Sequence, residues 1–149
     1  MVAVTILSLL FLVAVPTYQR LQRKARTATI VNNLRVFATA LQSHAHDTGT
    51  WPPEALAGVV PIGMTTDEFK TEDWTRPTPM GGHYDWEYNQ LHVGVRYRAA
   101  IAITGTSDAP LTIDYDQLLS IDSAIDDGDL NTGSFRLGFG DCGLFVIEP

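Results

Sequence analysis

The first fifteen residues, MVAVTILSLLFLVAV, contain no charged side chain, and Thr5 and Ser8 are their only polar residues. A helix of this length spans about 22 Å at roughly 1.5 Å per residue. The hydrocarbon core of a bilayer is about 30 Å thick, so the run alone is short for a membrane span. Both hydroxyls can donate back to a helix carbonyl, which makes them compatible with burial in lipid.

Three interpretations compete for this apolar run. A secretory signal has a basic segment before the run and a small-residue cleavage site after it, and the sequence shows neither. A buried core helix would require a large surrounding core, because the run has little amphipathic pattern. The third interpretation is a membrane segment whose beginning is missing, and it fits best, because about six more apolar residues would complete a span.

The helical pattern continues beyond Pro16. Apolar residues recur every three or four positions from Tyr18 to Ala45, as they do on one face of a helix. Gly49 provides a C-terminal cap, and Pro52 and Pro53 prevent continuation. The sequence therefore predicts a single helix of about 47 residues. The proline inside it removes one backbone hydrogen bond and is expected to kink or locally unwind the helix.

Residues 49–82 are rich in proline and glycine and predict a long irregular connection, with one short helical piece near Thr66 to Asp73. Trp51 and Trp74 are expected to anchor this connection to the helix or to a sheet. We expect Cys142, the single cysteine, to be a buried thiol.

The remaining segments predict a small antiparallel sheet. Gly82–Tyr88 and Gln90–Ile103 alternate and indicate a hairpin with its turn at Asn89-Gln90. Leu111–Ile125 indicates a short helix, and Ser134–Gly140 and Gly143–Ile147 indicate two closing strands.

These elements predict an α+β fold, a long N-terminal helix packed against a small antiparallel sheet. The helix has an apolar half, residues 1–15, and an amphipathic half, residues 16–48. The head comprises residues 49–149, with the irregular loop at 49–82 and the sheet at 83–149.

Charge is distributed unevenly along the chain. No acid precedes Asp47, whereas that part contains five bases, Arg20, Arg23, Lys24, Arg26 and Arg35. The rest contains all 17 acids, and the net charge of the chain is −7. The acidic head argues against a nucleic-acid partner, because contacts to phosphates require a basic surface.

The stretch LLFLVAVPTYQRLQRKAR, with the apolar pattern that follows it, resembles the N-terminus of type IV pilins and of type II secretion pseudopilins. In that superfamily an apolar half-helix, a proline and a basic amphipathic half-helix precede a globular head. The resemblance covers about the first 52 residues. TRPTPMGGHYDWEY and SIDSAIDDGDLNTGSFR also resemble segments of pseudopilin-like proteins. The pattern does not separate pilus subunits from secretion pseudopilins.

The resemblance implies a structural, non-enzymatic filament subunit. Before assembly it would be a single-pass protein of the inner membrane with its head in the periplasm. Its partners would be further copies of itself, other pilin-like subunits, an assembly ATPase and a platform membrane protein. The positive-inside rule would place Arg20–Arg26 in the cytoplasm. We expect the periplasmic side instead, because a cytoplasmic leader supplies the opposing charge in that superfamily.

When the sequence is aligned on Pro16, the superfamily's processing site falls upstream of Met1. That site is a glycine followed by Phe-Thr-Leu-Ile-Glu-like residues. The glycine is where the prepilin peptidase cuts, and the glutamate pairs with a neighbour's N-terminal amine. A start assigned to an internal methionine, a truncated chain and an unprocessed copy each explain this departure, and we expect the first.

Two charged segments have open interpretations. The basic run from Arg20 to Arg26 can contact anionic lipid headgroups or pair with acids of neighbouring subunits. The acidic stretch contains Asp126, Asp127, Asp129 and Asn131, whose hard oxygen atoms around a glycine suit Ca²⁺. The alternative is a plain turn held by side chain to backbone hydrogen bonds. A different class of protein also stays open, a monomeric membrane-tethered periplasmic domain that binds calcium or another ligand through this loop.

Overall fold

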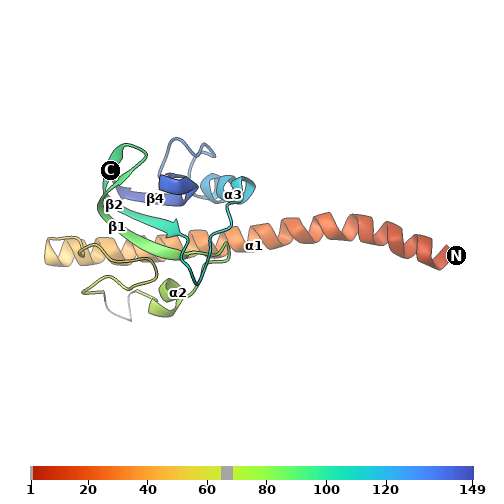
Figure 1. Ribbon diagram of the computed structural model, residues 1–149, viewed down its shortest axis with the longest axis horizontal. Coiled ribbons are helices and arrows are strands. Elements are labelled where there is room, and N and C mark those ends of the chain that lie inside the picture. The colour runs from red at the N-terminus through yellow and green to blue at the C-terminus, as the bar shows by residue number, and fades with distance from the viewer. Residues whose placement is uncertain (1, 65–68) are drawn as a thin grey trace.

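The computed structural model describes residues 2–64 and 69–149, and it confirms a long N-terminal helix packed against an antiparallel sheet (Figure 1). The helices are α1 (Val2–Thr48), α2 (Thr71–Thr75), α3 (Tyr115–Ile125) and the short 3₁₀ helix η1 (Phe139–Asp141). The strands are β1 (His83–His92), β2 (Val95–Thr104), β3 (Phe135–Leu137) and β4 (Gly143–Glu148). They form a four-stranded sheet in the order β1-β2-β4-β3, and every pair is antiparallel.

Helix α1 has the predicted length and the predicted end. It contains 47 residues and continues through Pro16. It ends at Thr48 because Gly49 adopts a φ of 77° and donates its N–H to the carbonyl of Ala45 at 2.9 Å. In Figure 1 the axis of α1 curves gently over its N-terminal half, and the helix is not divided in two.

The core lies where the second half of α1 meets the sheet. Ile30, Leu34, Phe37 and Leu41 are fully buried, and their spacing of three or four residues places them on one face of the helix. The Phe37 ring lies 5.0 Å from the ring of Tyr84 on β1, centroid to centroid. One aromatic side chain of α1 therefore joins the helix to the sheet.

The head leaves the first part of the amphipathic half of α1 uncovered. Tyr18 and Leu21, which continue the apolar pattern, are 67% and 62% exposed. Contact with the head is in place from Arg23, whose carbonyl accepts a hydrogen bond from Gln117 Nε2 of α3 at 3.4 Å, and the Thr27 hydroxyl accepts from the same Nε2 at 2.7 Å. Figure 1 shows the N-terminal part of α1 projecting away from the head without a neighbouring element.

The two predicted tryptophan anchors hold the connection between α1 and β1. Trp74 of α2 is fully buried and donates Nε1–H to the carbonyl of Val59 at 2.9 Å. Trp51 donates Nε1–H to Glu148 Oε2 at 2.8 Å, and its ring lies 5.6 Å from that of Trp86.

The short helix of this connection, α2 at Thr71–Thr75, overlaps the end of the range predicted near Thr66 to Asp73. Positions 65–68 of that range lie outside the described residues.

The predicted turn at Asn89-Gln90 is wrong. Strand β1 continues to His92, and the chain reverses at Val93 and Gly94, whose φ angles are 48° and 81°. Two successive positive φ angles define a type I′ turn, which matches the twist of a two-residue hairpin. The alternating pattern alone could not distinguish the two positions, because Val-Gly is a less typical turn pair than one with asparagine.

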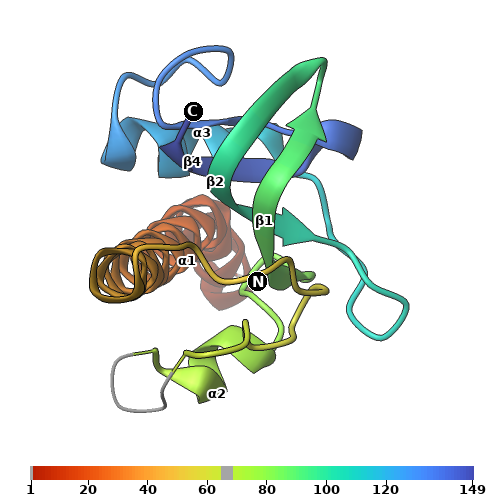
Figure 2. The same cartoon turned by 90° about the vertical axis from the view of Figure 1, so that its left-hand side faces the viewer.

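Helix α3 lies beside α1 and runs in the same direction. It begins after Asp114, whose Oδ1 accepts from the N–H groups of Asp116 and Gln117 at 3.1 and 3.3 Å. Near its end, Arg35 Nη2 of α1 donates to the carbonyl of Ala124 at 3.1 Å. Figure 2, which views the molecule approximately along α1, shows the sheet and α3 on one side of α1 and α2 on another.

Candidate functional site

The N-terminal half of α1 presents an uncovered apolar surface. Its large side chains are between 49% and 67% exposed: Val4, Ile6, Leu7, Leu9, Leu10 and Val15. Among the described residues α1 is the helix that is long and apolar enough to cross a membrane, and no part of its most apolar stretch is buried. This apolar helix is consistent with a single-pass membrane anchor.

The hydroxyl of Ser8, within this apolar surface, is paired by the helix itself. The Ser8 hydroxyl donates to the carbonyl of Val4, four residues earlier, at 2.8 Å. Such a bond removes the cost of placing a hydroxyl in an apolar environment. The surface can therefore be covered by lipid or by other apolar helices without leaving the Ser8 donor unpaired.

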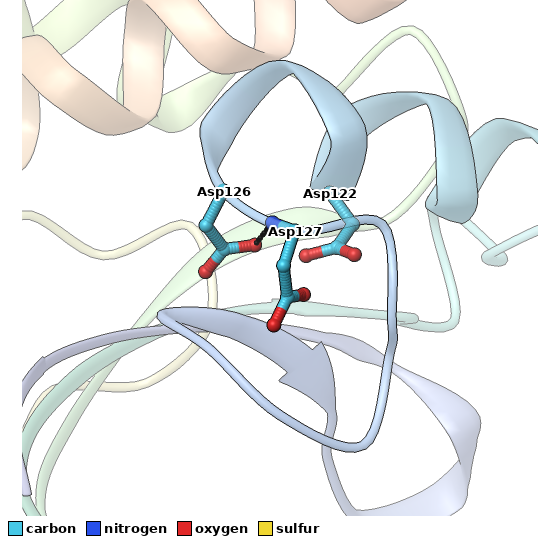
Figure 3. Close-up of side chains that lie close together, drawn as sticks. All are labelled: Asp122, Asp126 and Asp127. Carbon is cyan, nitrogen blue, oxygen red and sulfur yellow. Dashed lines mark hydrogen bonds between the residues drawn. The ribbon is translucent and has the colours of Figure 1, made fainter.

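The acidic loop after α3 forms the second candidate site. Asp122, Asp126 and Asp127 lie close together (Figure 3). One carboxylate oxygen from each of them lies within 4.8 Å of the other two. Asp129 is not a member of this group. Instead Asp129 Oδ1 accepts from the N–H and from Nδ2 of Asn131, at 3.0 and 2.8 Å.

The loop is also held by hydrogen bonds of its own. Asp126 Oδ2 accepts from the N–H groups of Ser134 and Phe135, and Asp126 Oδ1 accepts from that of Asp127. Asp127 Oδ2 accepts from the hydroxyl of Thr132 at 2.8 Å. Such bonds are those of the turn interpretation, and they fix the directions in which the carboxylates of Asp126 and Asp127 point.

Asp122 differs from the other acids of this loop because it is fully buried. Its exposed fraction is 0%, and neither carboxylate oxygen has a hydrogen-bond partner among the described residues. Burial, followed by the neighbouring carboxylates of Asp126 and Asp127, raises the pKa of Asp122 to about 7. Figure 3 shows its carboxyl group beside that of Asp127.

The pKa of Asp126 is shifted in the opposite direction. Burial alone would raise its pKa, but the interaction with Asp122 and the N–H groups of Ser134, Asp127 and Phe135 together lower it below its ordinary value. The group thus combines Asp126, whose pKa is lowered, with Asp122, whose pKa is raised to about 7. A divalent cation would favour ionisation of all three carboxyl groups.

Sequence reasoning missed Asp122, although a signal for it was present. Asp122 precedes Asp126 by four residues at the end of the predicted short helix, and residues four apart lie on the same helix face.

The basic run lies on α1 at the level of α3. Arg23 pairs with Asp114 and Asp116 at the start of α3, with N–O distances of 3.8 and 3.4 Å. Arg20 and Lys24 make no ion pair within the part of the chain that the structure describes.

A helix that is bare over one half and packed on a four-stranded antiparallel sheet over the other defines the pilin-like α+β fold. The solved structure of the major type IV pilin PilA1 from Clostridium difficile has this fold. It superposes with a TM-score of 0.51 over 85% of this chain and 97% of that chain, at 18% sequence identity. No protein-family model matches the sequence. No curated protein matches it either.

Proposed function

We propose that the chain is a structural, non-enzymatic subunit of a type IV pilus-like or type II secretion pseudopilus filament. Before assembly it is anchored in the inner membrane with its head in the periplasm. The observation that carries this proposal is the uncovered apolar half of α1 on a pilin-like fold.

The energetics of that half-helix support both the membrane-anchored state and the filament state. Covering a large apolar side chain stabilises by about 1.5 to 3 kcal/mol, so the six exposed side chains together favour a covered state by on the order of 10 kcal/mol. Lipid tails and packed apolar helices cover this surface about equally well. Transfer from bilayer to filament therefore gains little free energy by itself. An assembly ATPase and a platform membrane protein, which the resemblance implies, would supply the work.

The test uses the full chain in a bacterium that has a pilus assembly system. Leu7→Arg combined with Leu10→Arg is expected to abolish both membrane retention and filaments, measured by fractionation and electron microscopy. Leu56→Arg is the matched control, because Leu56 is 80% exposed on the head, and it should leave both intact. Membrane-retained protein that never forms filaments would favour the alternative, a monomeric tethered periplasmic domain.

We also infer a second function for the acidic loop, the binding of a divalent cation such as Ca²⁺. The specific observation is Asp122, a buried carboxyl whose two oxygens lack partners among the described residues beside two further carboxylates. Oxygen ligands of this kind suit Ca²⁺, and the ion would compensate the cost of a buried charge. Asp122, Asp126 and Asp127 supply the ligand oxygens in this proposal, whereas Asp129 and Asn131 stabilise the loop.

Thermal unfolding of the full chain in detergent tests the cation. Millimolar Ca²⁺ is expected to raise the midpoint relative to EDTA, because a ligand that binds only the folded state stabilises it. Asp122→Asn should remove this increase, and Asp129→Asn, the matched change in the same loop, should keep it. An unchanged midpoint in Ca²⁺ and EDTA would contradict cation binding, and loss of the response in Asp129→Asn would restore the ligand set predicted from sequence.

A further inference from the structure

A basic groove of about 740 Å³ runs between α1 and α3. Its cations all come from α1: Arg20, Arg23 and Lys24 near one end, and Arg35 about three turns further along. Ala28 and Val31 provide an apolar floor, and Ser120 and Ala124 of α3 form the opposite wall. The groove is a shaped surface rather than a row of isolated side chains.

The positive charge of this groove is only partly compensated. Arg23 pairs with Asp114 and Asp116, and Arg35 donates to a backbone carbonyl, which neutralises no charge. Arg20 and Lys24 have no acid within ion-pair distance among residues 2–64 and 69–149. The groove therefore keeps a net positive charge that can attract an anionic partner.

The same molecule carries an uncompensated negative surface next to the groove. The loop of Asp126, Asp127 and Asp129 follows directly on α3, whose last turn contacts Arg35. Its carboxylates accept bonds from N–H and hydroxyl groups of their own loop, and none pairs with a base in the described part of the chain. The bonds from Asn131 lower the pKa of Asp129, so this exposed group stays charged.

We propose that the basic groove of one copy receives the acidic loop of a second copy of this chain, chiefly through Asp129, the exposed acid of the loop that lies outside the proposed cation group. The inference rests on the proposed filament function and names one contact within the filament. Groove and loop are different surfaces on one molecule, so the loop of one copy can enter the groove of a second copy while its own groove receives the loop of a third, which is a head-to-tail contact. A head-to-tail contact repeats from copy to copy and generates an open filament unless its rotation closes a ring.

The length of the groove favours a second copy over lipid. Arg35 lies twenty residues beyond Val15, the last residue of the apolar run, and that separation is about 30 Å along α1. The headgroup layer adds only roughly 5 to 8 Å on each side of the hydrocarbon core. Lipid phosphates can thus reach Arg20, whereas the far end of the groove requires a partner that lies beside the head.

Cross-linking between two differently tagged full-length copies tests the contact without changing any charge. One copy carries Ala28→Cys in the groove, and the other carries Asn131→Cys in the acidic loop. We expect a mixed dimer with a short bismaleimide reagent in EDTA. Cys142 gives little background, because it is buried and its pKa is raised to about 12, chiefly by burial. The matched control, Ser107→Cys with Asn131→Cys, places the first thiol on a loop outside the groove and should give no mixed dimer.

Charge reversal then tests the cause of the contact. Lys24→Glu is expected to lower the yield of the mixed dimer about fivefold, and Asp129→Lys on the second copy should restore it. Filaments in the electron microscope without this cross-link would overturn the groove contact and leave the filament function standing. Absence of filaments together with the cross-link would overturn the filament function and keep the contact. If Lys24→Glu lowered binding to phosphatidylglycerol vesicles and left the cross-link yield unchanged, the groove would be a lipid site and the proposal would be wrong.

Discussion

Asp122 lies where burial and negative charge oppose each other most strongly. It is fully buried at the end of α3, and Asp126 and Asp127 place further carboxylates close to it. A carboxyl group in such a position is more easily accommodated when it is protonated. Its pKa is accordingly raised to about 7.

Asp122→Asn is expected to change how stability depends on pH. For a carboxyl whose pKa is raised on folding, the folded state binds more protons than the unfolded state between about pH 4 and pH 7. The contribution of Asp122 to the free energy of unfolding therefore decreases as pH rises through this window. The variant lacks this decrease and should be more stable than the wild type at pH 8 in EDTA, as measured by chemical unfolding.

The stability of Asp122→Asn has to be compared with that of the wild type at each pH, because Asp85 titrates in the same range. Burial, followed by repulsion from Glu87, raises the pKa of Asp85 to about 7 as well. Asp85→Asn is thus the matched control. It removes the pH-dependent loss of stability that Asp85 causes and keeps the loss that Asp122 causes. Parallel pH profiles for the wild type and Asp122→Asn would show that Asp122 does not carry an elevated pKa.

The hairpin formed by β1 and β2 carries a strained residue at its turn. Val93 is 70% exposed and adopts a φ of 48°, which is unfavourable for a β-branched side chain. Gly94 follows with a φ of 81°, which glycine adopts without cost. The cross-strand pairing from His92 with Val95 to His83 with Thr104 holds the turn in this geometry.

Replacing Val93 by asparagine is expected to stabilise the hairpin. Asparagine tolerates positive φ and, with Gly94, gives the preferred pair for a type I′ turn, so the free energy of unfolding should rise by about 1 kcal/mol. Urea unfolding measures the change. Val95→Asn makes the same substitution inside β2, where asparagine is unfavourable, and it should not stabilise the protein. Equal effects of the two changes would contradict the assignment of strain to Val93.

Elements with local signals could be predicted from the sequence. Gly49 marked the end of α1, and the apolar spacing marked part of the buried face, Val31, Leu34, Ala38 and Leu41. The turn at Val93 could not be predicted, because the register of the whole hairpin determines it and its own dipeptide does not. The exposure of Tyr18 and Leu21 could not be predicted either. Periodicity shows that a helix has an apolar face, but it does not show what covers that face.

At the scale of the whole molecule, distant contacts decide the candidate sites. Gln117 of α3 bonds to Thr27 of α1 across ninety positions, and this contact creates the groove between the two helices. Asp122 joins the acidic group because α3 ends with its last turn facing the loop. The ligands predicted from the loop alone were Asp126, Asp127, Asp129 and Asn131, and they omitted Asp122, whose four-residue spacing to Asp126 was the available signal.

The bases and acids that are separated along the sequence also occupy separate places in the structure. Four of the five bases of the first part line the groove between α1 and α3, and the acids of the loop follow directly on α3. One face of the molecule thus carries both charges next to each other, which suits repeated contact between identical copies.

The position of β4 determines when the head can form during synthesis. This strand, Gly143–Glu148, lies between β2 and β3 and pairs with both, so β3 has no place in the sheet before β4 is available. At about 5 to 20 residues per second, the ribosome finishes β4 on the order of ten seconds after the apolar half of α1 has been made. The membrane-seeking segment is thus exposed well before its head can fold, and the order of synthesis itself favours insertion first and folding afterwards.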